Sequence, residues 1–345
     1  MIKESLFAAE ERETKLNKLG DVLQILEKHV DFAALAAAID LAAPRPSRER
    51  GGRPPFPTEI MVRTLLLQQL YNLSDEQLEF QLLDRLSFQR FAGLRHSSQI
   101  PDRTTFWTFR ERLMAAGASE TIFEAANREL DKHGYLARGG QIIDASIVPA
   151  PKQHLHKGEK ALIKEQAIPI DWSPAKRRQK DIDATWTKKH GKSYFGYKLS
   201  ANADKRYKLI RKIKVSTASE HDTLHMDEVL DTFNTSRDLY GDKGYVDKER
   251  DTRLKAAGLR MHIQRKAVKG KPLSGCQKRR NTRIAKTRAR VEHVFASLEQ
   301  MGGKGLRCIG LDRATLQLNF KAATYNLRRL CSLKTCEIKS AFVFS

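Results

Sequence analysis

Three acidic residues have sequence surroundings that indicate chemistry. Asp144 interrupts an apolar, β-branched strand, where a charge is costly unless it is paired or bound to a metal ion. Asp242 follows the end of another expected strand, and Glu292 lies beside the apolar stripe of an expected helix, one turn after Arg288. Taken one at a time, these acids are explained as well by a buried ion pair, a turn and a solvated ion pair.

The three acids are more informative as a set. Strand ends and a neighbouring helix can bring together groups that are far apart in the sequence. Clustered carboxylates repel one another unless a counter-charge is present, and their hard oxygens suit Mg²⁺ or Mn²⁺. Two such ions, about 3.5–4 Å apart, stabilise the attacking and leaving oxygens of a phosphodiester displacement. The sequence therefore predicts that Asp144, Asp242 and Glu292 form a metal site for phosphodiester cleavage.

The positive charge of the chain is confined to two segments. The sequence carries 63 Lys and Arg against 41 Asp and Glu, a formal net charge of +22. Residues 151–220 hold 18 basic and 7 acidic side chains, residues 243–290 hold 17 and 3, and residues 221–242 between them hold one Arg and six acids. Two solvated basic faces are the simpler explanation, but an excess of this size favours a nucleic acid as the partner. The predicted phosphate contacts in these segments are Lys198, Lys243, Arg288 and Arg290.

Helical patterns precede the first strand. Residues 1–43 have leucines at helical spacing, and residues 44–57 are a Pro- and Arg-rich linker that cannot continue a helix. Residues 58–137 are helical again, and one of their helices presents Arg103 and Arg110 close to its start. A helix-turn-helix that binds DNA and an ordinary bundle with solvated arginines explain this pattern equally well.

From residue 138 onward, strands in series are followed by helices and strands in alternation, which is typical of a mixed α/β sheet. Strands are expected over 141–148, 194–202, 209–217, 237–241 and 260–264. Helices are expected over 224–233, 246–257, 284–301 and 312–330. The sequence thus predicts an all-α N-terminal domain, an α/β catalytic domain over 138–331 and a tail over 332–345.

Five motifs follow one another along the chain. They are Ile143-Asp144-Ala145-Ser146, the run from His190 to Leu199, His221-Asp222, Asp242-Lys243-Gly244-Tyr245 and the run from Arg288 to Phe295. In this order they resemble the DDE transposases of bacterial insertion sequences, most closely the insertion-sequence-five family. Residues 51–113 are also similar to that family's N-terminal helical segment. The resemblance implies a ribonuclease H-like mixed sheet with flanking helices, with Asp144, Asp242 and Glu292 as the catalytic, metal-binding triad.

The resemblance also implies a reaction. The enzyme would bind the terminal inverted repeats of double-stranded DNA and cut there with the help of Mg²⁺ or Mn²⁺. It would then transfer the released 3′-hydroxyl to target DNA, as a homo-oligomer assembled on double-stranded DNA. Many relatives have Lys or Arg seven residues after the catalytic Glu, whereas this chain has Glu299, with Lys304 as a candidate replacement. Two alternatives stay open: a non-cutting DNA-binding repressor of the same ancestry, and a plain metal-dependent nuclease.

Aromatic residues in basic surroundings are candidates to stack on a nucleic-acid base. Trp172 and Trp186 lie in the long basic segment and keep that role open. Trp107 stands among phenylalanines and is instead expected in the core. The pair His221-Asp222 is a candidate neighbour of the metal site, and equally a place where Asp222 caps a helix.

Other classes of protein find no support in the sequence. No apolar run is long enough to span a membrane, and the N-terminus lacks the apolar core of a secretion signal. No Gly-rich loop with Lys-Ser/Thr is present, so ATP hydrolysis is not predicted. The histidine pairs His154/His156 and His221/His225 lack a third zinc ligand. Four scattered cysteines are typical of reduced thiols, which predicts a cytoplasmic, nucleoid-associated protein.

Overall fold

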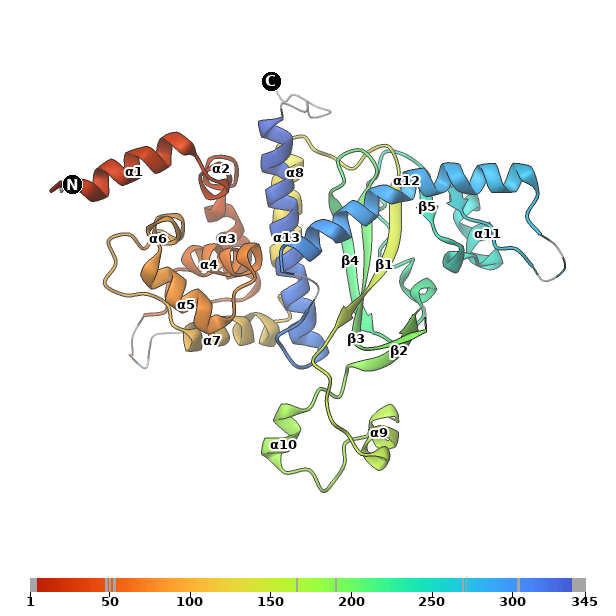
Figure 1. The fold of residues 1–345 in the computed structure, drawn as a ribbon, viewed down its shortest axis with the longest axis horizontal. Helices are drawn as coiled ribbons and strands as arrows, with labels where there is room; N and C mark the ends of the chain where they lie inside the picture. Colours follow the sequence, from red (N-terminus) through yellow and green to blue (C-terminus); the bar gives the residue numbers. More distant parts are fainter. Residues whose placement is uncertain are drawn as a thin grey trace, which may run out of the picture.

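The computed structural model describes residues 5–46, 49, 51, 54–165, 167–189, 191–268, 270, 272–302 and 305–336. In this part of the chain, helices alone precede the first strand, as predicted. They are α1 (Ala8–Leu19), α2 (Val22–His29), α3 (Phe32–Ala42), α4 (Thr58–Tyr71), α5 (Asp75–Asp84), α6 (Leu86–Ala92), α7 (Arg103–Ala115) and α8 (Thr121–Lys132). Figure 1 shows α1–α7 on one side of the molecule and the sheet on the other, with α13 (Leu311–Thr335) between them. Part of the predicted linker, most of the predicted tail and Lys304 lie outside the described residues.

Capping residues in the sequence begin several of these helices. The Ser74 hydroxyl accepts a hydrogen bond from the Gln77 N–H, and the Gln77 side chain accepts one from the Ser74 N–H, which is a complete capping box for α5. Asp102 accepts a hydrogen bond from the Thr105 N–H at 2.7 Å and so caps α7. Arg103 therefore stands in the first turn of α7, where the sequence predicts it.

A six-stranded mixed sheet forms the centre of the second half of the chain. Its strands are β1 (Gln141–Pro149), β2 (Thr185–Lys189), β3 (Lys192–Asp204), β4 (Ile210–Thr217), β5 (Asp238–Gly241) and β6 (Arg260–Ile263). β1 pairs antiparallel with β3 and parallel with β5, and β6 pairs parallel with β5. β2 and β4 both pair antiparallel with β3. The five predicted strands are confirmed, and the basic stretch before β3 supplies β2 as the sixth.

The helices of the second half are α9 (Lys157–Lys164), α10 (Pro174–Gln179), α11 (Lys248–Ala256), α12 (Gly275–Gln300) and α13, with 3₁₀ turns η1 (Asp222–His225) and η2 (Lys243–Tyr245). The helix predicted over 224–233 is wrong, because only η1 and irregular turns occupy that segment. The carboxylate of Asp231 and the amide oxygen of Asn234 accept hydrogen bonds from nearby backbone N–H groups, which competes with helix formation. In the ranges described, no helix combines the length and the apolar character that crossing a bilayer requires.

One hydrophobic core joins the helices to the sheet. Apolar residues of α2–α8, of one face of the sheet, and of α12 and α13 belong to a single buried cluster. Helix α13 is central to it: 15 of its 25 residues are buried, and it packs against α8, α4 and α2 as well as β4. A smaller apolar cluster, which includes Met226, Tyr245 and Leu254, covers the opposite face of the sheet. The helical region and the sheet region thus share buried residues, and the predicted domain limits remain predictions.

Candidate active site

Asp144 lies on β1, and Asp242 directly follows β5, the strand that pairs in parallel with β1. β1 and β5 pair with Ile142 opposite Tyr240, and continuing that register by two residues brings Asp144 beside Asp242. Because side chains alternate along a strand, Asp144 points to the same face as Ile142, which packs into the main core. Helix α12 crosses that face and packs against both β1 and β5. Two of the three predicted acids are therefore brought together beneath the helix that carries the third.

Arg288 of α12 provides the counter-charge for Asp144. Its Nη2 donates to Asp144 Oδ2 at 3.0 Å, and its Nη1 donates to Gln264 Oε1 at 3.2 Å. The two side chains of the ion pair are 13% and 20% exposed, respectively. Burial raises the pKa of Asp144 and the charge of Asp242 adds to this shift, whereas Arg288 and a hydrogen bond from the Ala145 N–H oppose it. Arg288 is thus the counter-charge that favours the ionised form of Asp144.

Asp242 is positioned by the turn that follows β5. Its Oδ1 accepts a hydrogen bond from the Gly244 N–H at 2.7 Å, so that Asp242 caps η2. A Cβ on Gly244 would lie 2.9 Å from that same oxygen, so a larger residue there would disturb the carboxylate. Lys243, the next residue after Asp242, is exposed. The motif Asp-Lys-Gly-Tyr therefore forms a turn and also presents an acid at the end of a strand.

Glu292 does not join the two aspartates in this conformation. It is exposed on α12, one turn beyond Arg288. Within the described ranges, no three His, Cys, Asp or Glu side chains lie close enough to hold a metal ion. The expectation that all three acids converge is thus met by two of them. Arg288 already neutralises Asp144, and a third carboxylate without a bound cation would be repelled by the other two.

Tyr245 and the ion pair of Lys198 with Asp222 complete the surroundings of the aspartates. Tyr245 is 1% exposed, and burial together with the charges of Asp144, Asp222 and Asp242 raises the pKa of its hydroxyl. Lys198 of β3 is largely buried, and its Nζ lies 2.8 Å from Asp222 Oδ1. His221, and not Asp222, caps η1, so the predicted cap is wrong and Asp222 is instead one of the acids near Tyr245. Sequence reasoning gave Tyr245 no role, although it belongs to a motif.

The remaining predicted DNA contacts divide between two regions. Arg290 is exposed on α12 and donates to the carbonyl of Lys205. Arg103 forms an exposed ion pair with Glu76 of α5 at 2.8 Å. Arg110 donates from both terminal nitrogens to Asp75, with Nη1 and Oδ1 2.9 Å apart. Arg103 and Arg110 are therefore already paired to acids of α5.

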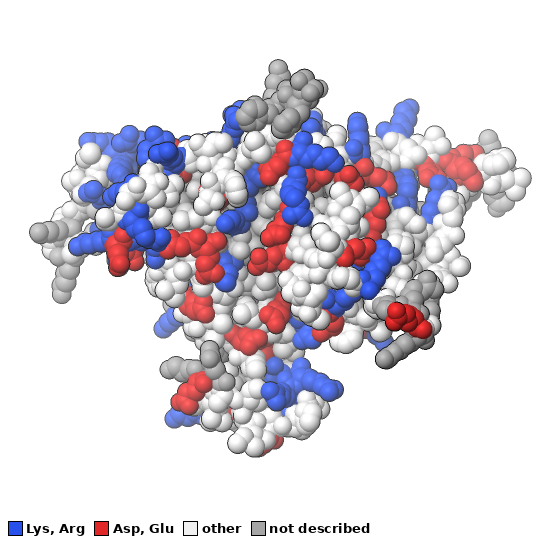
Figure 2. Space-filling view, turned by 180° about the vertical axis from the view of Figure 1, so that it is seen from behind, with Lys and Arg blue, Asp and Glu red and all other residues white. Residues whose placement is uncertain are grey.

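Charge is mixed over one whole face of the molecule. Figure 2 shows the side opposite to the view in Figure 1, and there lysines and arginines alternate with acidic side chains. Among the described residues, that face therefore shows no single continuous basic patch.

The tryptophans differ from expectation in two of three cases. Trp172 is buried, and its Nε1 donates to Glu159 at 2.8 Å, so it is not free to stack on a base. Trp107, expected in the core, is 53% exposed. Trp186 of β2 is 45% exposed and remains a candidate for stacking.

Comparison with known families identifies both halves of the chain. Residues 10–112 match the family described as "Transposase domain (DUF772)", and residues 136–327 match the family described as "Transposase DDE domain". No solved structure matches the chain. These matches support a transposase, while the closer resemblance to the insertion-sequence-five family stays a prediction. The chain belongs to the DDE transposases of insertion sequences, enzymes that cleave phosphodiester bonds and transfer DNA strands.

Proposed function

We propose that this transposase binds the terminal inverted repeats of its element and catalyses metal-dependent cleavage and strand transfer, with Asp144, Asp242 and Glu292 as its catalytic triad. The observation that carries the proposal is the parallel register of β1 and β5, which brings Asp144 and the residue that follows β5, Asp242, to the same level of the sheet beneath α12. That helix bears Glu292. The mixed sheet with helices on both faces supports a ribonuclease H-like catalytic domain.

The donor set suits a divalent cation. Two carboxylates lie close enough for the charge of one to raise the pKa of the other, and hard oxygens of this kind are the ligands of Mg²⁺ and Mn²⁺. Asp144 and Asp242 would hold the metal, and Glu292 would be the third ligand. Two ions are expected, and Mg²⁺ or Mn²⁺ would be used to probe the site. When bound, such ions activate water and stabilise the attacking and leaving oxygens.

Glu292 is assigned to the triad by its place on α12. Residues four apart on a helix share a face, and Arg288, four residues earlier, already reaches Asp144. No hydrogen bond or ion pair between described residues fixes the Glu292 carboxylate, so its side chain can change rotamer at little cost. Arg288 then becomes available for a DNA phosphate, alongside Lys198, Lys243 and Arg290.

The decisive experiment uses a duplex that carries the element's terminal repeat, identified in the genomic flanks. Asp144→Asn, Asp242→Asn and Glu292→Gln are each expected to lower the cleavage rate by about 10³-fold or more, because each removes a metal ligand. Binding of the same duplex, measured by fluorescence anisotropy, should be retained. Glu124→Gln, an exposed acid of α8, is the matched control and should cleave like the wild type.

The possible outcomes test separate parts of the proposal. Cleavage that persists in Asp144→Asn or Asp242→Asn would refute the metal site. Normal cleavage in Glu292→Gln alone would keep the site and replace its third ligand. Loss of cleavage on chelation of the metal, restored by Mg²⁺ or Mn²⁺, is expected in the wild type.

A further inference from the structure

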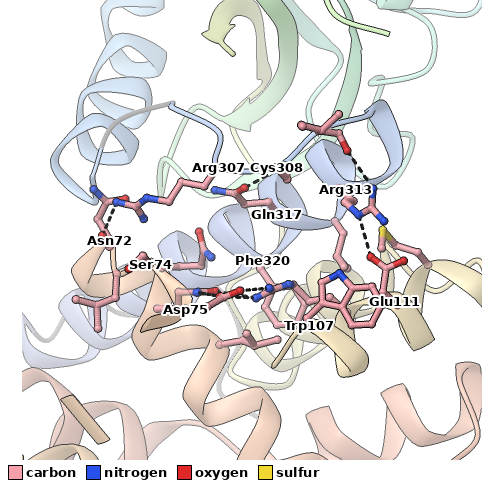
Figure 3. Close-up of a pocket in the computed structure, with 18 of the residues that line it drawn as sticks. Asn72, Ser74, Asp75, Trp107, Glu111, Arg307, Cys308, Arg313, Gln317 and Phe320 are labelled. Atoms are coloured by element: carbon pink, nitrogen blue, oxygen red, sulfur yellow. Dashed lines mark hydrogen bonds and ion pairs between the residues drawn. The ribbon is translucent and has the colours of Figure 1, made fainter. Parts of the chain in front are cut away.

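A cavity that neither Asp144 nor Asp242 lines lies where the N-terminal helices meet α13. The cavity has a volume of about 590 Å³. Its walls come from α4, α5 and α7, from α13, from the segment before α13 and from Arg178 of α10 (Figure 3). The lining therefore combines residues from both family matches, 10–112 and 136–327.

The cavity has an excess of positive charge. Four arginines and two acids line it. Asp75 pairs with Arg110, and Glu111 pairs with Arg313 at 2.8 Å. The other two arginines, Arg178 and Arg307, have no ion pair with any described residue. Arg307 donates to the backbone carbonyl of Asn72 at 2.9 Å, a neutral partner, and Arg178 is exposed.

Trp107 gives the same cavity an apolar surface. Its neighbours on α7, Phe106 and Phe109, are buried in the core, whereas Trp107 is half exposed and lines the cavity. In Figure 3 its indole lies between the ion pair of Asp75 and the ion pair of Glu111. A large aromatic ring held in a basic, partly open cavity is a surface for a ligand that is both anionic and partly apolar.

The site lies just beyond the end of the catalytic helix. Glu292 is eight residues from Gln300, the last residue of α12, which corresponds to about 12 Å of helix. The segment that contains Arg307 follows this helix and leads into α13. A Cβ on Gly302, two residues after α12, would collide with Asn72, which lines the cavity, so α12 ends at the cavity wall.

We propose that this cavity binds the sugar-phosphate backbone of duplex DNA outside the catalytic centre. Arg178 and Arg307 contact phosphates, and Trp107 packs against deoxyribose. The proposal rests on the proposed function, because the DNA is that of the transposition reaction. The alternative is a water-filled cavity that does not bind DNA. In that case the two ion pairs would be enough to hold its walls together, and substitution of Arg178 or Arg307 would not change the affinity for DNA.

The first test measures the affinity for an arbitrary duplex without metal at several salt concentrations. Neither cleavage nor recognition of the terminal repeat enters this measurement, so its outcome is independent of the triad. Arg178→Gln and Arg307→Gln are each expected to reduce the slope of log affinity against log salt by about 1, and the double variant by about 2. Arg177→Gln is the matched control, since Arg177 is an exposed neighbour on α10 that does not line the cavity.

Unchanged slopes in both variants would overturn the proposal, and so would an equal effect of Arg177→Gln. Thermal midpoints within about 1 °C of the wild type would show that the fold is intact.

In a second test, Trp172→Phe and Trp186→Phe together leave Trp107 as the sole tryptophan. Duplex DNA should then change the emission, while inorganic phosphate or a deoxynucleoside monophosphate at equal phosphate concentration should not. A response to the mononucleotide alone would also overturn the proposal.

Discussion

The hydroxyl of Tyr245 is buried and has no hydrogen-bond partner among the described residues. Removing such a hydroxyl does not lower the free energy of unfolding, because the penalty for desolvating the hydroxyl is removed with it. Tyr245→Phe is therefore expected to leave the free energy of unfolding unchanged or raise it by up to about 1 kcal/mol. Urea unfolding without metal measures this effect.

Tyr197 supplies the control. It is equally buried, but its hydroxyl donates to Asp181 Oδ1 at 2.7 Å, and Asp181 is itself buried. Tyr197→Phe should cost about 1–3 kcal/mol, because it leaves an acceptor without this donor. A loss of stability in Tyr245→Phe as large as that in Tyr197→Phe would contradict the assignment of an unpartnered hydroxyl.

Lys321 makes stability depend on pH. It is buried on α13, and burial, with the charge of Arg307 as the second cause, lowers its pKa to about 8. Between about pH 8 and the ordinary value of 10.5 the unfolded chain holds a proton that the folded chain has released, so wild-type stability rises with pH in that range. Lys321→Met should be more stable than the wild type at pH 7, and this advantage should shrink by pH 9.5.

The measurement for Lys321 is the difference in unfolding free energy between variant and wild type at the two pH values. Lys286→Met, on the exposed side of α12, should show a difference that does not change with pH. A constant difference for Lys321→Met as well would show that burial does not penalise its charged form.

Single residues were predictable where the signal was local. Asp144 was recognisable because a charge interrupts an apolar strand, and Asp242 because it follows a strand end. The orientation of Glu292 depends on the rotation of α12 about its axis over the sheet and on the ion pair that Arg288 forms with Asp144. Neither feature produces a pattern in the local sequence. Trp107 was misjudged because neighbouring positions on a helix differ by about 100°, so a buried Phe106 does not bury the next residue.

At the scale of elements, capping signals and strand patterns located most helices and strands. The helix prediction for residues 224–233 failed because the apolar residues of this segment have helical spacing. The side chains of Asp231 and Asn234 instead accept hydrogen bonds from backbone N–H groups in turns. Strand β2 was missed because only five residues pair, and its side chains are mostly exposed. Pairing with β3, a tertiary contact, defines it.

The pairing of β1 with β3 depends on Gly196. Its φ is +149°, and a Cβ would lie 2.2 Å from the Val148 carbonyl oxygen and 2.6 Å from the Ala150 nitrogen. Gly196→Ala must therefore shift the strand that bears Asp144, and is expected to cost at least about 2 kcal/mol. Urea unfolding checks this value, with Gly158→Ala as control, because nothing lies within 4 Å of a Cβ there and α9 should gain slightly. Equal effects of the two substitutions would contradict the argument.

At the scale of the molecule, the sequence predicts a helical region and a sheet region but not the core that they share. Helix α13 is buried on most sides although its buried residues include Asn319, Lys321 and Asn326, so its sequence does not mark it as the central helix of either region. Its position is visible only in the contacts. Asn326, fully buried, accepts from the Ile210 N–H at 2.9 Å and donates to the Ile210 carbonyl at 2.7 Å and to Asn127 at 2.9 Å. One side chain thus links α13 to the sheet and to α8.

The shared core predicts that the molecule unfolds in one step. Two variants that each retain one tryptophan, Trp107 in α7 or Trp186 in β2, report on the helical region and on the sheet. Their urea transitions should have coincident midpoints and slopes, because neither region can expose its side of α13 without destabilising the other. An Asn326→Leu substitution should lower both midpoints together. A transition of Trp107 that precedes that of Trp186 would show instead that the N-terminal helices are an independent unit.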